Sequence, residues 1–269
     1  MIERWNQFWF HKESSHLLGL LRIFVGVTFL LKLTGLHGFT SRFSGTVKLP
    51  RHAFKKRSEY YIDGFSLDVP GFGWVPKPSI EVYQDIETAL LIMCFFFIAG
   101  LFTRIVAPLL ALTWAYLFVL SQFNYHHHVF TFVLTLLVLG FSRCGDHYSL
   151  DAYLFGAVKR APKRPITPIR MLQILVTVIY LGGTLAKVNG GWMDGSYVQH
   201  LFQTRRMNGD FAFVAPLMGF RFLGSFTVVV ETLLIFGLWV PRLRRVTWLL
   251  GVALHLGIDL TMDVTTNGL

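Results

Sequence analysis

Three consecutive histidines, His126, His127 and His128, stand between two apolar runs of the chain. Imidazole exchanges protons near neutral pH and also binds metals, so the stretch is a candidate for either chemistry. Successive residues of a helix point about 100° apart, so at most one or two of these rings can face one site. No second group of metal ligands accompanies them, and we therefore expect no metal. The stretch predicts hydrogen-bonding rings at a membrane surface, with His126 as an interface residue.

Ionisable side chains also interrupt the apolar runs, where an unpaired charge costs several kcal/mol. Glu231 has apolar neighbours on both sides, so its carboxyl needs a cationic partner, for which Arg22 is available, or stays protonated. His255 and Asp259 share one helical face, either as a base with its orienting carboxylate, as metal ligands or as a plain hydrogen-bonded pair. The full set comprises Arg22, Lys32, Lys187, Glu231, His255 and Asp259.

Lys187 lies in the segment IYLGGTLAKVNGGWMDGS, at the end of an apolar run. The small residues Gly182 and Gly183 allow a helix or a ligand to approach closely. Asn189 and the two glycines after it end the helix, and Trp192 is typical of a membrane interface. A lysine held in a dry site can act as a neutral base, whereas a lysine near the headgroups extends into them. The residues alone leave both interpretations open.

The composition is that of a protein dissolved in lipid. Of 269 residues, 53% are hydrophobic and 15% are charged, and the mean hydropathy is +0.51. A soluble domain of this length requires a more charged exterior, so we expect a polytopic integral membrane protein. The net charge of +10 comes mainly from connecting segments, which indicates contact with lipid headgroups rather than nucleic acid. Cys94 and Cys144 do not form a disulfide framework or a metal motif.

Apolar runs of helical length predict the architecture. Backbone polar groups in lipid must be satisfied within their own segment, so each run is expected to be a helix. The prediction is an all-α transmembrane bundle of about seven spans. The whole chain, 1–269, is expected to form a single membrane-embedded domain, with interfacial loops carrying short helices at 37–85 and 188–221 and no soluble C-terminal domain. The runs are 17–36, 86–102, 105–123, 128–142, 169–187, 222–240 and 246–262.

The absolute orientation of the chain in the membrane stays open, because basic residues are nearly equal in number on the two sides. The relative placement is clearer. With seven spans, the ends of the third, fifth and seventh emerge on the same side of the membrane. The histidine stretch, Lys187 and the end of the last span would then share one face.

Taken in chain order, these motifs resemble the HTTM membrane domain, the family that includes vitamin K-dependent γ-glutamyl carboxylase. The similarity extends over residues 15–262. No single motif is specific, but their order and spacing are. The motifs are His127-His128, Ser149-Leu150-Asp151-Ala152, Ala186-Lys187-Val188-Asn189 with Trp192 and Gly195, Glu231, and His255-Leu256-Gly257.

The resemblance implies roles for individual residues. The family's lysine in the Lys-x-x-x-x-Trp context deprotonates vitamin K hydroquinone, and that role falls on Lys187. The family's histidine before the Ser-x-Asp motif corresponds to His128, which would hydrogen-bond an oxyanion of the activated quinone. The residues expected to bind the quinone are His127, Asn124, Asn189, Trp192, Glu231 and His255.

The resemblance also implies an activity, a lyase reaction in the membrane. Reduced vitamin K or a related quinol, O2 and CO2 would be the co-reactants, and a glutamyl or other acceptor would be carboxylated. Oxygen would convert the deprotonated quinol into a strong base, which a water-poor pocket protects from bulk protons. The implied partners are the lipid bilayer, a membrane quinone and a peptide or protein substrate. The location would be a bacterial inner membrane or an endomembrane equivalent, with the site near the non-cytoplasmic face.

Two other functions remain open. One is a non-carboxylating maturation factor for a secreted peptide, since bacterial members of the wider family are associated with such peptides. The other is a transporter lined by Arg22, Glu231, His255 and Asp259, although the chain has no inverted repeat of the kind that many transporters contain.

Overall fold

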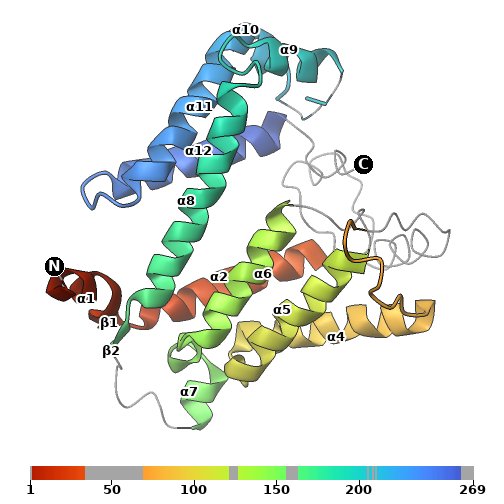
Figure 1. Ribbon diagram of the computed structural model, residues 1–269, viewed down its shortest axis with the longest axis vertical. Helices are drawn as coiled ribbons and strands as arrows, with labels where there is room; N and C mark the ends of the chain where they lie inside the picture. Colours follow the sequence, from red (N-terminus) through yellow and green to blue (C-terminus); the bar gives the residue numbers. More distant parts are fainter. Residues whose placement is uncertain are drawn as a thin grey trace. The chain divides into compact units, whose positions relative to one another are not determined.

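The computed structural model describes residues 2–33, 69–120, 127–155, 163–204, 206–207, 209 and 211–261. Their contacts divide the chain into two compact units. Among the described residues, unit 1 extends to Leu172, and unit 2 begins at Gln173, inside a long helix. Within these residues the secondary structure is helical apart from one small sheet (Figure 1).

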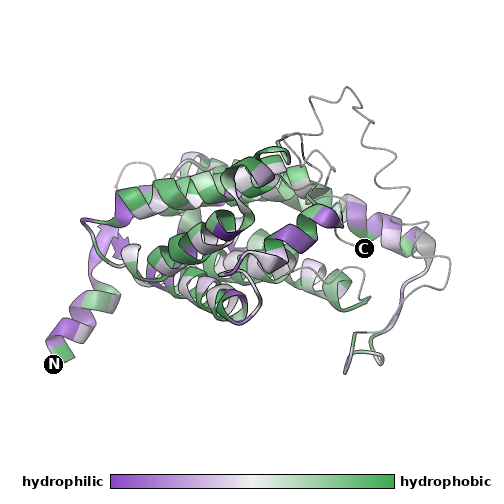
Figure 2. Cartoon of the chain, turned by 90° about the horizontal axis from the view of Figure 1, so that it is seen from above, coloured by the Kyte–Doolittle hydropathy of each residue, from purple (hydrophilic) through white to green (hydrophobic). Residues whose placement is uncertain are grey.

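The chain begins with the amphipathic helix α1 (Ile2–Phe10). Figure 2 shows hydrophilic and hydrophobic residues mixed along it, whereas the long helices are mainly hydrophobic. Strand β1 (Lys12–Ser14) follows and pairs antiparallel with β2 (Lys163–Pro165). The hydroxyl of Thr167 donates to the carbonyl of Trp9 at 2.6 Å, beside this sheet. These contacts tie α1 to the start of the fifth predicted span, and the three-residue strands are an addition to the predicted all-α fold.

Four helices form the core of unit 1. Helix α5 packs against α4 and α6, and α2 packs against α4. Their facing sides bury aliphatic and aromatic side chains, among them Phe29, Phe97 and Trp114. Ser79 caps the start of α4, and Gly100 ends it in the left-handed conformation at φ 73°. The bounds are α2 (His16–Leu33), α4 (Ile80–Ala99), α5 (Thr103–Leu120) and α6 (His127–Phe141).

Arg22 of α2 is fully buried in unit 1. It donates to the carbonyl of Cys144 at 3.1 Å and of Ile98 at 3.4 Å, and also to the carbonyl of Tyr148. These carbonyls belong to the end of α4, the 3-10 helix η2 (Cys144–Asp146) and the loop after it. Arg22 therefore provides hydrogen bonds to backbone carbonyls at the point where the end of α4, η2 and the loop after η2 meet.

The Ser-Leu-Asp-Ala motif forms two helix caps. Ser149 accepts a hydrogen bond from the backbone of Ala152 at 3.0 Å and begins the short helix α7 (Leu150–Leu154). The carboxylate of Asp151 accepts from the backbone nitrogens of Phe102 at 2.8 Å and Thr103 at 3.0 Å, so it caps α5 from a distant part of the chain. This motif has a structural explanation within unit 1.

In its described residues, unit 2 contains most of α8 and four further helices. Helix α11 packs against α9, α10 and α12, and α9 and α10 lie at one end of α11 (Figure 1). The two short helices lie within 188–221, the second predicted interfacial loop, and its place at the membrane interface stays a prediction. Residues 34–68, the larger part of the predicted loop 37–85, lie outside the described residues. The bounds are α8 (Thr167–Val188), α9 (Ser196–Gln203), α10 (Val214–Met218), α11 (Phe220–Gly237) and α12 (Arg244–Thr261).

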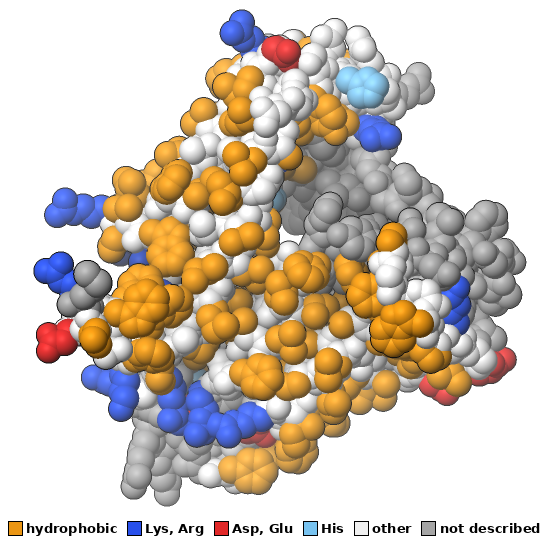
Figure 3. Space-filling model, viewed as in Figure 1, with side chains coloured by type: hydrophobic (Ala, Val, Ile, Leu, Met, Phe, Trp, Pro, Cys, Tyr) orange, Lys and Arg blue, Asp and Glu red, His pale blue; other side chains and the backbone are white. Residues whose placement is uncertain are grey.

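Each predicted apolar run forms a helix in the described residues, although α4 ends at Ala99 and α11 at Gly237, before the predicted ends at 102 and 240. Four helices in this part of the chain are long and apolar enough to cross a membrane, namely Glu81–Ala99 of α4, α5, α8 and α11. Helices α2 and α6 contain shorter apolar stretches. Hydrophobic side chains cover much of the surface in Figure 3, as expected for helices that face lipid. The structure thus supports a polytopic membrane protein, and the number of seven spans stays a prediction.

Candidate functional site

A line of polar residues runs along one face of α8. The intervals between them alternate between four and three residues, which keeps them on one side of a helix. We call this line the α8 polar stripe. Its residues are Gln173, Thr177, Tyr180, Thr184 and Lys187.

The stripe faces the rest of unit 2. Near its start, the amide of Gln173 donates to the carbonyl of Leu238 at 3.5 Å, and the indole nitrogen of Trp239 donates to the hydroxyl of Thr177 at 2.8 Å. Interhelical hydrogen bonds of this kind hold membrane helices together where burial of apolar surface cannot. The polar side of α8 is thus turned toward the protein, which leaves its apolar sides for lipid.

The end of the stripe carries an ion pair that joins α8 to α11. The ammonium nitrogen of Lys187 lies 2.9 Å from both carboxylate oxygens of Glu231. The side chain of Lys187 is 21% exposed and that of Glu231 is 9% exposed, so most of the pair is shielded from solvent. The cationic partner of Glu231 is therefore Lys187 rather than Arg22, whose two terminal guanidinium nitrogens donate to carbonyls of unit 1.

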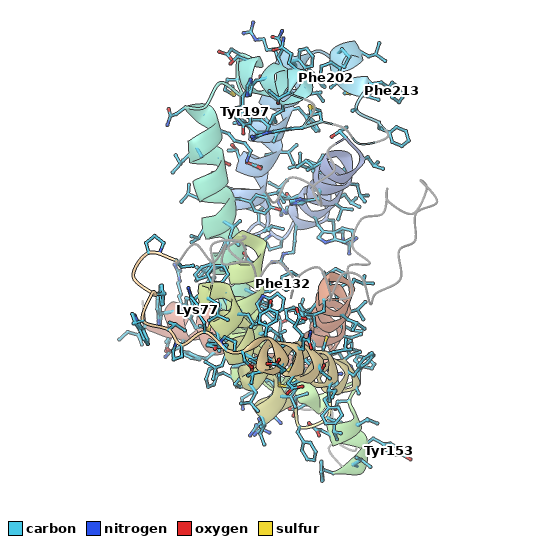
Figure 4. The ribbon with its side chains drawn as sticks, turned by 90° about the vertical axis from the view of Figure 1, so that its right-hand side faces the viewer. Lys77, Phe132, Tyr153, Tyr197, Phe202 and Phe213 are labelled. Carbon is cyan, nitrogen blue, oxygen red and sulfur yellow. The ribbon has the colours of Figure 1, made fainter. Side chains whose placement is uncertain are left out.

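Trp192 covers the other side of the lysine. The ammonium of Lys187 lies 5.3 Å from the centroid of a Trp192 ring, which is within the range of a cation–π contact. Trp192 stacks in turn on Tyr197 of α9 (labelled in Figure 4), with ring centroids 5.1 Å apart. The ammonium is thus held between a carboxylate and an aromatic surface.

The two glycines before Lys187 differ in the atoms that surround them. A Cβ atom on Gly183 would lie 3.5 Å from the ammonium of Lys187 and 3.6 Å from a carboxylate oxygen of Glu231. A Cβ on Gly182 would meet nothing within 4 Å. The predicted close approach therefore occurs at Gly183, where the ion pair lies next to the helix backbone.

Gly195 shapes the loop that carries Trp192. Its φ is +84°, a conformation that glycine adopts without strain, and a Cβ there would clash with the backbone of Arg221. A Cβ on Gly224 of α11 would likewise clash with the carbonyl of Trp192. The glycine of the Lys-x-Asn-x-x-Trp-x-x-Gly motif is thus required for the loop to pack against α11.

Tyr180 and His255 form a second polar contact, between α8 and α12. The phenol oxygen of Tyr180 lies 2.7 Å from Nε2 of His255. The apolar side chains of Val230, Leu234 and Leu254 form a buried cluster against which Tyr180 packs. Tyr180 belongs to the α8 polar stripe, as does Lys187, so the dyad and the ion pair lie along the same face of one helix.

Thr184 lies on the stripe between Tyr180 and Lys187. It is 8% exposed, and its hydroxyl has no hydrogen-bond partner in the described part of the chain. Other helical threonines donate to the carbonyl four residues earlier, as do Thr28, Thr88, Thr135, Thr177, Thr227, Thr232 and Thr261. The hydroxyl of Thr184 is therefore available to a bound molecule.

Sequence reasoning missed Tyr180 and Thr184, because it searched the apolar runs for ionisable residues. The signal was nevertheless present. Tyr180 and Thr184 precede Lys187 by seven and three residues, which places all three on the same face of one helix. A search for polar residues at these intervals would have found them.

The remaining predicted residues of unit 2 have other surroundings. The side-chain amide of Asn189 donates to the carbonyl of Leu185 at 3.3 Å, a bond that closes the end of α8. His255 contacts Tyr180 as described above. The side chain of Asp259 lies outside the described residues, so its predicted pairing with His255 stays a prediction.

The histidines at the start of α6 belong to unit 1. Helix α6 begins at His127, so His127 and His128 occupy its first turn. Their side chains, together with Asn124 and His126, lie outside the described residues. The predicted meeting of His128 with Lys187 stays a prediction. No group of three or more possible metal ligands occurs among the described residues.

Comparison with known proteins gives one result. A family model described as the HTTM domain matches residues 10–265. No curated protein and no solved structure matches the chain. The matched range includes both units and every predicted site residue, among them Lys187, Glu231 and His255. The chain therefore belongs to the HTTM domain family.

Proposed function

We propose that this protein is a membrane enzyme of the vitamin K-dependent carboxylase type, in which Lys187 and Glu231 together take a proton from a reduced quinone. Membership of the HTTM family supports the reaction class, and the apolar helices support a substrate dissolved in the bilayer. The observation that carries the proposal is the contact of the Lys187 ammonium with both carboxylate oxygens of Glu231 at 2.9 Å.

The pair explains how a lysine can act as a base in a shielded place. An ammonium beside a carboxylate and a neutral amine beside a carboxylic acid differ by one proton moved across the 2.9 Å contact. In the second form, the amine of Lys187 accepts the proton of a quinol hydroxyl. The quinol O–H bond breaks, an N–H bond forms, and Glu231 keeps the other proton. The new ammonium lies next to the quinol anion, and its charge stabilises that anion.

The surrounding residues fit an aromatic substrate. Trp192 lies next to the ammonium and stacks on Tyr197, and aromatic side chains suit an offset stack with a quinone ring. By resemblance, His128 would hydrogen-bond the quinone oxyanion, with His127, Asn124, Asn189 and His255 as further binding residues. Oxygen and CO2 would be the other co-reactants, and a glutamyl side chain of a peptide or protein the acceptor.

The test is epoxide formation from reduced vitamin K under oxygen by the purified full chain in lipid nanodiscs. Lys187→Ala should lower the rate by about 10²–10⁴, the usual contribution of a general base. Lys187→Arg should not restore it, because a guanidinium stays charged. Glu231→Gln should cause a loss of similar size, since the amide cannot hold the second proton.

Folding controls are needed because removing one partner leaves the other charge buried and unpaired. The double variant Lys187→Met with Glu231→Gln removes both charges and should melt close to the wild type while remaining inactive. Wild-type rates in folded Lys187→Ala protein would exclude the pair as the base. Epoxide without any carboxylated peptide would favour the maturation-factor function over carboxylation.

A further inference from the structure

Unit 1 contains a cavity that the proposed reaction does not use. It has a volume of about 350 Å³ and lies at the start of α5, beside the end of α6, η2 and α7. Its lining combines two arginines, two aspartates and several apolar side chains. Among the lining residues are Arg104, Arg143, Asp146, Asp151, Ile105 and Phe155.

The two aspartates of this cavity already have partners. The carboxylate of Asp151 accepts hydrogen bonds from the backbone nitrogens of Phe102 and Thr103. A carboxylate oxygen of Asp146 lies 2.6 Å from Nε of Arg164, which belongs to β2. With Arg164 included, three arginines and two aspartates surround the cavity, so its net charge is positive.

The two arginines of the lining keep donors for a ligand. Arg104 lies in the first turn of α5 and makes no ion pair within the described ranges of the chain. A guanidinium nitrogen of Arg143 lies 3.9 Å from Asp146, which is longer than a hydrogen bond. Guanidinium groups present a planar fork of N–H donors that matches the oxygens of a phosphate. The cavity therefore suits an anion of the phosphate type.

The apolar surface next to the cavity indicates what the phosphate is attached to. Phe102, Ile105, Leu109 and Leu112 are all exposed, and their spacing places them on one side of α5. Helix α5 is long and apolar enough to cross a membrane and begins beside the cavity, so this row leads from the cavity along the span. Figure 3 shows Lys and Arg side chains gathered below the hydrophobic surface of the unit 1 helices. A free phosphate makes no contact with such a row, whereas the acyl chains of a lipid can cover it.

We propose that this cavity binds the headgroup of an anionic phospholipid, with its phosphate between Arg104 and Arg143 and its acyl chains along the row on α5. Arg104 lies at the start of α5 and Arg143 follows the end of α6, so the bound lipid joins these two helices. A ligand that binds the folded protein and not the unfolded chain stabilises the fold. The lipid thus stabilises unit 1, independently of the reaction proposed for unit 2.

Thermal melts of the full chain in lipid nanodiscs test the site. The wild type should melt about 3 °C or more higher in phosphatidylglycerol than in phosphatidylcholine with the same acyl chains, because only the first lipid has a net negative charge. Arg104→Gln with Arg143→Gln should lose most of this difference while melting close to the wild type in phosphatidylcholine. Arg242→Gln with Arg245→Gln is the matched control, since it removes two exposed arginines that lie outside the cavity. It should keep the difference.

Inorganic phosphate added to phosphatidylcholine nanodiscs should leave the melting temperature unchanged, because it lacks acyl chains. A rise with inorganic phosphate would indicate a site for a soluble anion, and an equal lipid difference in the wild type and the Arg104–Arg143 double variant would assign that difference to general surface charge. Either result overturns the proposal. If the double variant does not fold, Arg104→Gln alone decides, since Arg104 has no ion pair to lose in the described chain. A smaller lipid difference in Arg104→Gln supports the site, and an unchanged one overturns it.

Discussion

Gly182 and Gly183 are neighbours in α8 that differ in their surroundings, and this difference gives a test at the scale of one methyl group. At Gly183 the added methyl would lie in van der Waals contact with both members of the Lys187–Glu231 pair. At Gly182 it would lie in open space. Alanine is the better helix former by about 1 kcal/mol, so both variants should be at least as stable as the wild type.

We expect Gly183→Ala to raise the KM for the quinol several-fold, because the methyl narrows the approach to the amine. Gly182→Ala should leave KM unchanged. Steady-state epoxide formation measures KM, and a thermal melt checks folding. An equal KM in the two variants would mean that the substrate approaches Lys187 from a side away from Gly183.

Individual residues also show how far chemistry can be read from sequence. Lys187 and Glu231 stand out because each is a charge in an apolar run, and charge in lipid is expensive. Their pairing does not stand out, because the two residues are 44 positions apart and Arg22 was an equally available cation. The choice between the two cations is made by which helix lies beside α11.

At the scale of elements, His147 connects α2 to the loop between η2 and α7. Its ring stacks on His16 at the start of α2, with centroids 3.9 Å apart. Burial lowers the pKa of His147 below its ordinary value of 6.5, and the neighbouring His16 lowers it further. The folded state thus favours the neutral ring, and the unfolded state takes up a proton first as the pH falls.

Stability contributed by this stack should therefore be complete above pH 6.5 and should decrease as the pH falls from there through the lower pKa of the folded state. Thermal melts between pH 8 and pH 5 should show a falling melting temperature, and His147→Gln should reduce that slope. A slope unchanged in His147→Gln would assign the pH dependence to other groups. His11 is a useful internal contrast, because the side chain of Glu13 and the carbonyl of Gln7 raise its pKa.

The positions of the helices could be predicted from the sequence. Which side of each helix carries the site could be predicted only in part. Every apolar run became a helix because lipid offers no partner for backbone groups. The α8 polar stripe was visible as a regular interval of polar residues, yet its partners were not. Trp239 and His255 lie 62 and 75 positions from the residues they contact. The small sheet of β1 and β2 gave no signal, because three-residue strands are too short for a pattern.

At the scale of the whole molecule, more basic residues lie at the start of α8 than at its end, where Lys187 is in the last turn. Lys163 and Arg164 precede the helix and Arg170 lies in its first turns, whereas Trp192 follows its end. Short basic segments stay on the cytoplasmic side. The count of basic residues over the whole chain leaves the orientation open, but the residues next to α8 predict that its start lies in the cytoplasm and Lys187 near the opposite face of the membrane.

Cysteine labelling tests this orientation. A membrane-impermeant maleimide should label Gln203→Cys from outside in right-side-out vesicles, and Lys163→Cys only after the membrane is permeabilised. The native Cys94 and Cys144 are both buried, so the wild type is the background control. The reverse labelling pattern would place the Lys187 end of α8 on the cytoplasmic side.

The sequence alone determined that the protein lies in a lipid bilayer, where its helical segments are, and which charged residues can take part in chemistry. These properties follow from local composition. Backbone groups without hydrogen bonds and charges without partners are unfavourable in lipid, and this applies to each segment separately. Only the tertiary structure decided that Lys187 meets Glu231, that Tyr180 meets His255 and that Thr184 keeps an unused hydroxyl. Such pairings depend on which helix faces which, and that is set by packing over the whole of unit 2.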